Sequence, residues 1–338
     1  MHDNTAQPAI ALVGCGAIAE KFYLPALTQH REIFDRLILV DNNLSRAKEM
    51  AHRFNVRRTA ADYRELIGEV QGAIIAVPHY LHFPISRDFL NARVHVLCEK
   101  PLSEKASEVR EMARLAEVNG VTISVNNTRR LVPSNVAVKQ MIESGELGTL
   151  RMITYLEGGE FDWPTASGFY FNSKLSQKGV LLDVGAHALD VICQWLGAKP
   201  RLVSSENDSF GGRDAVSSVE LLHAECRAVV RLSWLSKLPN TFRVVGDKGI
   251  IDGPIYDWKS VTLTSADGRS KKVRTEMGYA NADEFLRKPV VNFIDILTKH
   301  ASSLIPAQSV IPSIELIEEA YAAARRFPMP WYDGRNNQ

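Results

Sequence analysis

A glycine pattern close to the N-terminus limits the folds open to this chain more than any other feature. The pattern G-x-G-x-x-A, at residues 14–19, directly follows the apolar run AIALV and stands where a helix is expected to begin. Gly14 permits the tight turn, Gly16 lets the backbone approach a pyrophosphate, and the small Ala19 lets the helix pack closely on the strand. Such a helix N-terminus favours phosphate groups. The residues expected to contact a dinucleotide are Gly14, Gly16, Ala17 and Ile18.

Short apolar runs alternate with helical patterns from residue 9 to residue 125. The runs are AIALVG, RLILVD, GAIIAV, RVHVLCE and VTISVN, and the stretches between them, such as SRAKEMAHRF and SEVREMARLAEV, carry apolar residues three and four apart. Continuous apolar strands separated by helices are typical of a parallel sheet covered on both faces. Together with the glycine pattern they predict an α/β fold, with a doubly wound Rossmann domain over residues 1–126.

The second apolar run ends in Asp41, within LILVDNN. A carboxylate at this position can accept hydrogen bonds from both hydroxyls of an adenosine ribose, and it repels a 2′-phosphate. The sequence therefore favours NAD over NADP, with NADP still possible. Arg46 lies five residues further on and could partner a phosphate, but a solvated charge on a helix face is the preferred interpretation.

The alternation of strands and helices ends after Asn126. Helices are expected at about 134–144, 183–196, 282–300 and 314–326. Strand-like segments follow one another with no helix between most of them, among them RMITYLE, RLVSSE, AVSSVELLH, RAVVRLSWL, TFRVVG, SVTLTS and KKVRTE. We therefore predict a second, α+β domain over residues 127–338, built on a large and mainly antiparallel sheet.

Composition excludes several classes of function. The 338 residues include 40 Lys and Arg against 39 Asp and Glu, a formal charge of +1, so no charge of one sign favours nucleic acid or an anionic membrane. The 4 cysteines form no C-x-x-C pair, which favours a reducing compartment. No apolar stretch is long enough to span a bilayer, so a cytoplasmic location is expected.

The run RVHVLCE leads into Glu99-Lys100-Pro101. Ligands of open α/β sheets bind at the carboxyl ends of the strands, so this turn would place two opposite charges at the mouth of a cofactor cleft. The tripeptide alone fits a surface turn equally well.

A second candidate pair is Asp183 and His187, in the stretch GVLLDVGAHALD. Four residues apart, they would share one face near the start of a helix. Alcohol oxidation needs such a pair, because an imidazole can take or return the hydroxyl proton at neutral pH while a carboxylate orients it. A helix-capping Asp with a buried His would give the same pattern. Asp190, one turn further on, is interpreted as structural.

The combination of GCGAIA, Asp41, AVPHYLH, CEKP and DVGAH followed by LD resembles the Gfo/Idh/MocA oxidoreductases over nearly the whole chain. The resemblance implies a Rossmann domain and a C-terminal domain whose open sheet forms homodimers or homotetramers. It also implies an NAD(P)-dependent dehydrogenase or reductase. Such an enzyme transfers a hydride between nicotinamide and a secondary alcohol or ketone of a sugar, cyclitol or nucleotide-sugar.

The same resemblance implies roles for individual residues. Lys100 would contact the reacting hydroxyl, Asp183 would lie beside the substrate, and His187 would exchange the proton; alternatively Lys100 is itself the acid and base. The remaining residues implied at the cofactor are Ala76, Val77, Pro78, His82, Glu99 and Arg130. Leu131 stands where relatives often have an aromatic residue after this arginine. No third ligand of suitable spacing follows His79 and His82, so no metal is expected.

The segment GGEFDWPTASGFYFNS contains four aromatic residues, in a loop that relatives lay over the substrate. Trp163 and Tyr170 are the residues expected to contact a sugar ring, although such aromatics can equally anchor a loop to the core. Many relatives have several glycines before the catalytic Asp, whereas this chain has only Gly179. Gln177 and Lys178 could therefore face the substrate, or belong to the loop surface. Two other functions stay open: an enzyme that uses tightly bound NAD for transient oxidation, and a non-catalytic dinucleotide sensor.

Overall fold

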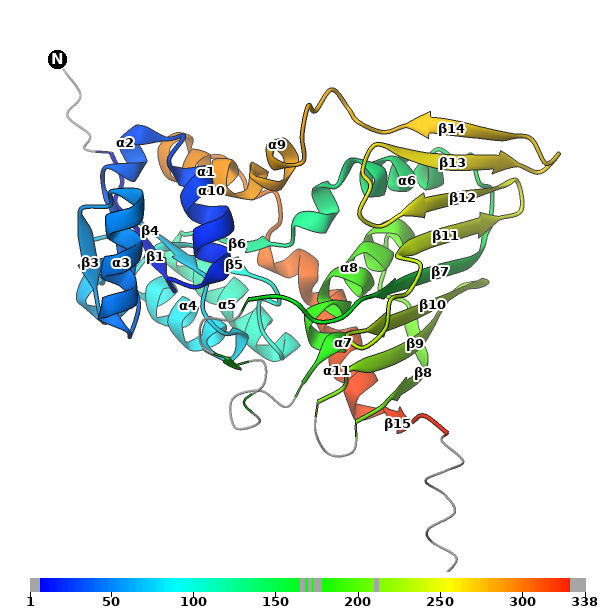
Figure 1. Ribbon diagram of the computed structural model, residues 1–338, viewed down its shortest axis with the longest axis horizontal. Coiled ribbons are helices and arrows are strands. Elements are labelled where there is room, and N and C mark those ends of the chain that lie inside the picture. The colour runs from blue at the N-terminus through cyan, green and yellow to red at the C-terminus, as the bar shows by residue number, and fades with distance from the viewer. Residues whose placement is uncertain (1–6, 165–167, 170–171, 173–177, 210–212, 329–338) are drawn as a thin grey trace, which may run out of the picture. The chain divides into compact units, whose positions relative to one another are not determined.

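Six parallel strands and the helices around them make up most of the first of two compact units in the computed structural model (Figure 1). The structure describes residues 7–164, 168–169, 172, 178–209 and 213–328. The first unit consists of Met1–Val132, Trp163–Leu175 and Gly278–Glu315, and the second of Pro133–Asp162, Ser176–Met277 and Leu316–Gln338. The predicted division between residues 126 and 127 stays a proposal.

The sheet of the first unit has the order β3-β2-β1-β4-β5-β6. Its strands are β1 (Ile10–Val13), β2 (Leu37–Val40), β3 (Arg58–Ala60), β4 (Gly72–Ile75), β5 (His95–Glu99) and β6 (Ile123–Asn126). All neighbours pair in parallel, and the direction of winding reverses between β1 and β4. The Rossmann prediction is therefore confirmed. β3 was not expected, because its three residues, Arg-Thr-Ala, carry no apolar run.

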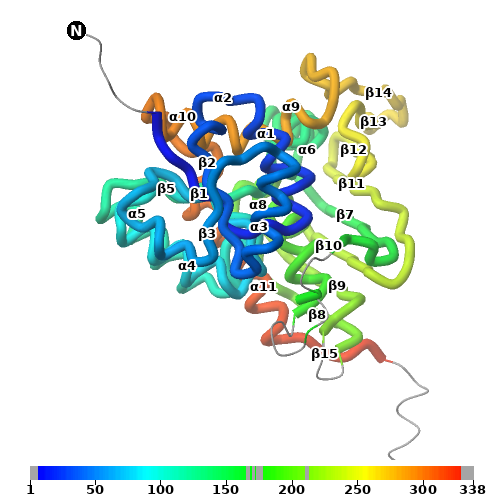
Figure 2. The backbone as a smooth tube through the Cα atoms, turned by 60° about the vertical axis from the view of Figure 1, so that its left-hand side comes forward, coloured from blue at the N-terminus to red at the C-terminus, as the bar shows by residue number. Residues whose placement is uncertain are grey.

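Helices cover this sheet. They include η1 (Ala19–Tyr23), α1 (Leu24–Leu27), α2 (Arg31–Phe34), α3 (Leu44–Phe54), η3 (His79–Leu81), α4 (His82–Asn91), α5 (Ala106–Asn119), η4 (Thr128–Leu131), α9 (Asp283–Leu286), α10 (Lys288–Lys299) and η6 (Ala307–Val310). Figures 1 and 2 both show α10 beside the N-terminal helices, although it is distant in sequence. Its Val290 and Phe293 are buried in one apolar cluster with residues of β1 and β2. No helix among the described residues combines the length and apolarity needed to cross a membrane.

The sheet of the second unit has the order β14-β13-β12-β11-β7-β10-β9-β8-β15. Its strands are β7 (Leu150–Gly158), β8 (Arg201–Asn207), β9 (Val216–His223), β10 (Cys226–Ser233), β11 (Thr241–Gly246), β12 (Gly249–Pro254), β13 (Ser260–Ser265), β14 (Ser270–Arg274) and β15 (Arg325–Arg326). Among the described strands of this sheet, only β7–β10 and β8–β15 pair in parallel, so the prediction of a mainly antiparallel sheet is confirmed. β12 was missed because glycine and proline interrupt it; Gly253 there leaves room for the ring of Phe242.

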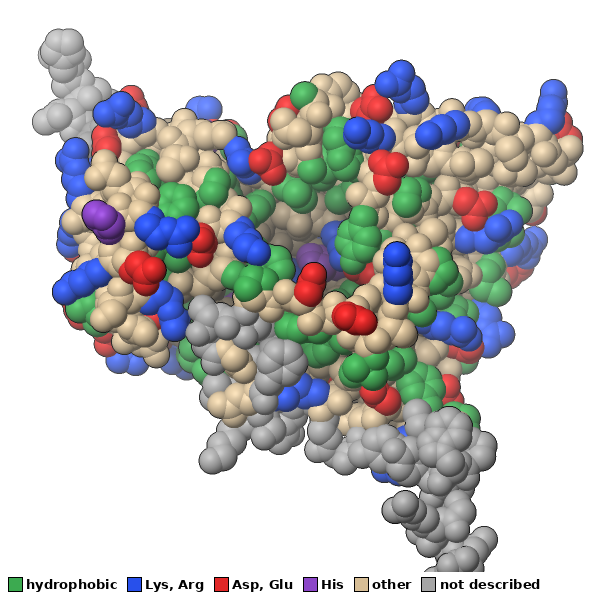
Figure 3. Space-filling view, viewed as in Figure 1, with side chains coloured by type: hydrophobic (Ala, Val, Ile, Leu, Met, Phe, Trp, Pro, Cys, Tyr) green, Lys and Arg blue, Asp and Glu red, His purple; other side chains and the backbone are tan. Residues whose placement is uncertain are grey.

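The helices of this unit are α6 (Pro133–Glu143), α7 (Val180–Asp183), α8 (Gly185–Leu196) and much of α11 (Ile311–Ala322). The helix expected at 183–196 is in fact two, separated at Val184. Asp183 is consequently the last residue of α7, and His187 lies in the first turn of α8. On the face shown in Figure 3, side chains of both charges are interspersed, as the near-zero net charge predicts.

Candidate functional site

The glycine loop follows β1 and is held by the neighbouring strands. The Gly14 N–H donates to the carbonyl of Val40 at 2.8 Å. Gly14 has φ +102°, and a Cβ there would lie 2.4 Å from the carbonyl oxygen of Ala76, so only glycine fits. At Gly16, by contrast, a Cβ would meet no atom within 4 Å. The open side of the loop at Gly16 is the approach that a pyrophosphate requires, so the loop fits a dinucleotide.

Asp41 lies directly after β2 and is 7% exposed. Its Oδ2 accepts a hydrogen bond from the Cys15 N–H at 2.9 Å, and its Oδ1 accepts one from the Asn43 N–H at 2.8 Å. Arg46 lies 3.5 Å from the same carboxylate, so its charge is paired and not simply solvated. Asp41 therefore holds the glycine loop in place, and its carboxylate oxygens can still accept hydrogen bonds from a ribose.

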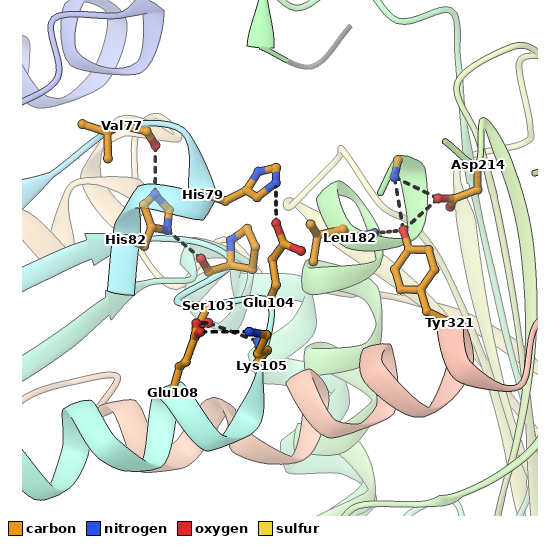
Figure 4. A network of polar contacts seen from close by, with 12 residues as sticks. Val77, His79, His82, Ser103, Glu104, Lys105, Glu108, Leu182, Asp214 and Tyr321 are labelled. Atoms are coloured by element: carbon orange, nitrogen blue, oxygen red, sulfur yellow. Dashed lines mark hydrogen bonds and ion pairs between the residues drawn. The ribbon is translucent and has the colours of Figure 1, made fainter. Parts of the chain in front are cut away.

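The end of β4 meets the loop from the other side. The Ala76 N–H donates to the carbonyl of Val13 at 2.8 Å, and Val77 and Pro78, both partly exposed, follow. His82 is 1% exposed, with Nδ1 2.7 Å from the carbonyl oxygen of Pro101 and Nε2 2.9 Å from that of Val77 (Figure 4). Burial lowers its pKa to about 4. His82 thus links the segments after β4 and β5, and its expected contact with a cofactor stays a prediction.

Lys100 follows the last residue of β5 and is partly exposed. The preceding Glu99 is buried: its Oε1 accepts hydrogen bonds from the Tyr23 hydroxyl at 2.7 Å and the Asn126 amide at 2.6 Å. Its Oε2 accepts the Lys100 N–H at 3.2 Å. Burial raises the pKa of Glu99, and these donors oppose that shift. Neither Tyr23 nor Asn126 was singled out from the sequence, because only folding brings them to Glu99.

Three further contacts lie within the first unit. His79 Nε2 lies 2.9 Å from Glu104 Oε1, as Figure 4 shows, and its ring packs against Phe169. Trp163 is 43% exposed, with the Lys21 Nζ 5.2 Å from its ring centroid. Tyr170 and Gln177 lie outside the described residues.

Arg130 lies in η4 and is bound to the protein itself. Its guanidinium donates to the hydroxyl and to the carbonyl oxygen of Ser309, each at 2.7 Å. This anchors η4 to η6 within the first unit; a cofactor contact by Arg130 stays a prediction.

In the second unit, Asp183 and His187 occupy consecutive helical turns, both partly exposed. Buried Asp214 accepts hydrogen bonds from the N–H groups of Gly179 and Leu181, at 2.8 and 2.9 Å. The Tyr321 hydroxyl donates to Asp214 at 2.8 Å (Figure 4). These two side chains cap the start of α7, which ends at Asp183.

The hydroxyl of Tyr321 also accepts the N–H groups of Gly179 and Leu182, at 3.2 and 3.1 Å. Sequence reasoning missed both capping residues, because they lie 31 and 138 positions beyond Asp183 in the chain. Lys178 Nζ lies 5.2 Å from the centroid of the Tyr321 ring, so the lysine contacts a residue of its own unit. Within the described part of the chain, no three His, Cys, Asp or Glu side chains are grouped to hold a metal ion.

Comparison with known proteins agrees with this geometry. Residues 9–127 match the family described as an oxidoreductase family with an NAD-binding Rossmann fold, and residues 135–252 match the GFO/IDH/MocA C-terminal domain. Trans-1,2-dihydrobenzene-1,2-diol dehydrogenase of Mus musculus is 30% identical over 251 residues, which are 71% of this chain and 72% of that protein.

Solved structures show the same fold. A levoglucosan dehydrogenase in complex with NADH and levoglucosan has a TM-score of 0.78 at 19% identity, covering 94% of this chain and 97% of that one. A 3-ketoreductase from Actinomadura kijaniata, in complex with NADP and TDP-benzene, has a TM-score of 0.81 at 18% identity, covering 96% and 100%. With both of its domain models matched in order, the chain belongs to the Gfo/Idh/MocA family of NAD-binding oxidoreductases.

Proposed function

We propose that this dehydrogenase transfers a hydride between a nicotinamide cofactor and a secondary alcohol or ketone on the ring of a sugar, cyclitol or nucleotide-sugar. One observation carries the proposal. The carboxyl ends of parallel strands β1, β2, β4 and β5 bring the glycine loop, Asp41, the segment 76–78 and Lys100 to one edge of a single sheet. This edge includes the switch point between β1 and β4, where such sheets bind dinucleotides.

The roles proposed for the side chains follow from their chemistry. The nicotinamide cofactor, when bound, accepts or supplies the hydride. Lys100 donates a hydrogen bond to the reacting oxygen, which polarises a ketone and steadies an alkoxide. His187 accepts the hydroxyl proton during oxidation and returns it during reduction, and Asp183 orients the substrate and the imidazole.

The relatives support a ring hydroxyl as the reacting group. The mouse relative is named for a six-membered ring that carries two adjacent hydroxyls, and the levoglucosan dehydrogenase was solved with an anhydrosugar. Both names describe secondary alcohols on a rigid ring. We therefore expect pyranoses, inositols and cyclic trans-diols to be oxidised faster than open-chain polyols of the same size.

The experiment measures reduced nicotinamide by its absorbance while this panel is offered with NAD and then with NADP. Lys100→Ala should lower turnover about a hundred- to ten-thousand-fold on the best substrate. Lys105→Ala is the matched control, since that exposed lysine forms an ion pair with Glu108 in the same segment. The proposal fails if no ring alcohol reduces the cofactor, or if Lys100→Ala behaves like Lys105→Ala.

A further inference from the structure

The helix behind the glycine loop contains a turn of unusual geometry. In η1, a π-helical turn of five residues, the Leu24 N–H donates to the carbonyl of Ala19, five positions earlier. The hydrogen bonds of an ordinary α-helix reach back four positions, so this hydrogen-bonded turn encloses one extra residue. Turns of this kind are rare and are found frequently at functional sites. Two residues of this turn are fully buried, Ala19 and Tyr23, and of these only Tyr23 has a polar side-chain group.

The Tyr23 hydroxyl is hydrogen-bonded to the buried carboxylate of Glu99. It donates to Glu99 Oε1 at 2.7 Å, and Asn126 donates to the same oxygen at 2.6 Å. The other oxygen of Glu99 accepts the Lys100 N–H at 3.2 Å. Three elements therefore meet at Glu99: η1 behind the glycine loop, β6, and the turn that carries Lys100.

Glu99 stays ionised only if its donors compensate for burial. Burial raises its pKa, whereas the amide of Asn126, the hydroxyl of Tyr23 and the charge of Lys100 lower it. Within the described part of the chain, the titratable groups that face Glu99 are Tyr23 of η1 and the two chain neighbours of Glu99, Cys98 and Lys100. The strand β6 supplies the neutral Asn126. Loss of the hydroxyl would leave the carboxylate with fewer donors and a higher pKa.

We propose that Tyr23 is a positioning residue for Lys100, acting through Glu99. The hydroxyl fixes the carboxylate, and the carboxylate fixes the backbone and attracts the charge of the lysine beside it. The same contact joins the helix that backs the dinucleotide loop to the turn that bears Lys100. This inference rests on the proposed function, in which Lys100 contacts the reacting oxygen.

The test compares two identical substitutions in one unit. Tyr23→Phe removes the hydroxyl and keeps the buried ring. Tyr63→Phe is the matched control, because Tyr63 also donates to a carboxylate at 2.7 Å, that of Asp88, on elements that do not carry Lys100. Misplacing a reacting group by about 1 Å costs on the order of a hundred-fold in rate, so a smaller displacement should lower kcat by about ten-fold or more in Tyr23→Phe. The dissociation constant of the dinucleotide should be unchanged in both variants.

The pH profile supplies a readout that a purely structural role would not move. Glu99 in Tyr23→Phe should take up a proton at a higher pH. The acid limb of the pH profile of kcat should therefore lie at higher pH than in the wild type and in Tyr63→Phe. If Tyr23→Phe folds poorly, Asn126→Leu removes the second donor to the same oxygen and should shift the limb in the same direction.

The outcomes separate the two proposals. Equal kcat and equal pH profiles for Tyr23→Phe and Tyr63→Phe would overturn the positioning role, even while Lys100→Ala is inactive. Full activity of Lys100→Ala would instead overturn the proposed function, whatever Tyr23→Phe does. An unshifted acid limb in both Tyr23→Phe and Asn126→Leu would also contradict the inference.

Discussion

Asp41 has two roles, an expected contact with the ribose and contacts within the protein, and its position in the sequence predicts only the first. The end of a β-strand beside a glycine loop predicts a ribose contact, whereas the structure adds the hydrogen bond to the Cys15 N–H and the ion pair with Arg46. Asp41→Ala should therefore weaken NAD binding by about ten-fold or more, as the loss of a charged hydrogen-bond partner implies. The difference between the affinities for NAD and NADP should become smaller. Calorimetric titration with both dinucleotides measures this. Tighter binding of NADP by the unmodified protein would contradict the assignment of NAD.

His82 makes a prediction about stability rather than activity. Neutral imidazole has one N–H, so it donates to only one of its two carbonyl partners; burial outweighs the attraction of both carbonyls for imidazolium and lowers the pKa from 6.5 to about 4. Between these values the unfolded chain binds a proton at His82 and the folded chain does not. Acidification from about pH 7 to 4 should therefore cost about 3 kcal/mol through this residue.

Urea unfolding at several pH values checks this, with His82→Gln as the comparison. The variant is expected to be less stable at neutral pH but to lose less stability on acidification than the wild type. Parallel pH dependence in the two proteins would show that His82 does not titrate with the shifted pKa.

At the scale of elements, α7 shows why sequence reasoning misplaced the start of a helix. The pattern of residues 183–196 predicts one helix that begins at Asp183, but the helical turn begins at Val180. The N–H groups at its start are satisfied by Asp214 and Tyr321, and no local pattern reveals such distant partners. The strands were easier to predict, because β1, β2, β4, β5 and β6 each carry their own apolar run.

Tyr321→Phe tests whether this cap supports the chemistry proposed for Asp183. The substitution removes one donor to Asp214 and one acceptor for α7, and helix caps contribute about 0.5–2 kcal/mol. We expect a loss of that size in urea unfolding, together with a lower kcat, because Asp183 ends the helix that loosens. Tyr256→Phe in the same unit, which loses a 2.6 Å hydrogen bond to Glu157 of β7, is the control. Equal kcat values in the two variants would show that this cap does not affect catalysis.

At the scale of the whole molecule, the sequence predicted both sheets and the order of the motifs along the chain. It could not predict that Gly278–Glu315 belongs with the first unit, because the apolar face of α10 is compatible with any core. The same limit applies to the candidate site. Motifs indicated Gly14, Asp41 and Lys100 from their neighbours in sequence, whereas Tyr23 and Tyr321 became visible only through contacts between distant segments.

The sheet of the second unit leads to the last prediction, the formation of a homodimer or homotetramer. Leu232 of β10 faces α8, since a Cβ on Gly185 would lie 3.3 Å from its Cδ1. Side chains alternate along a strand, so Val229 and the exposed Arg227 and Arg231 lie on the opposite face. We expect copies of the chain to associate through that face, as the family resemblance implies.

Val229→Asp would place a charge where the expected partner packs, but would leave it hydrated in a single chain. Light scattering after gel filtration should therefore show a smaller assembly for this variant than for the wild type, with the difference increasing on dilution. Val118→Asp, at a 69% exposed valine on α5 of the first unit, controls for the added charge. A wild type that is monomeric at all concentrations would overturn the expectation. An assembly that survives Val229→Asp but not Val118→Asp would move the interface to the first unit.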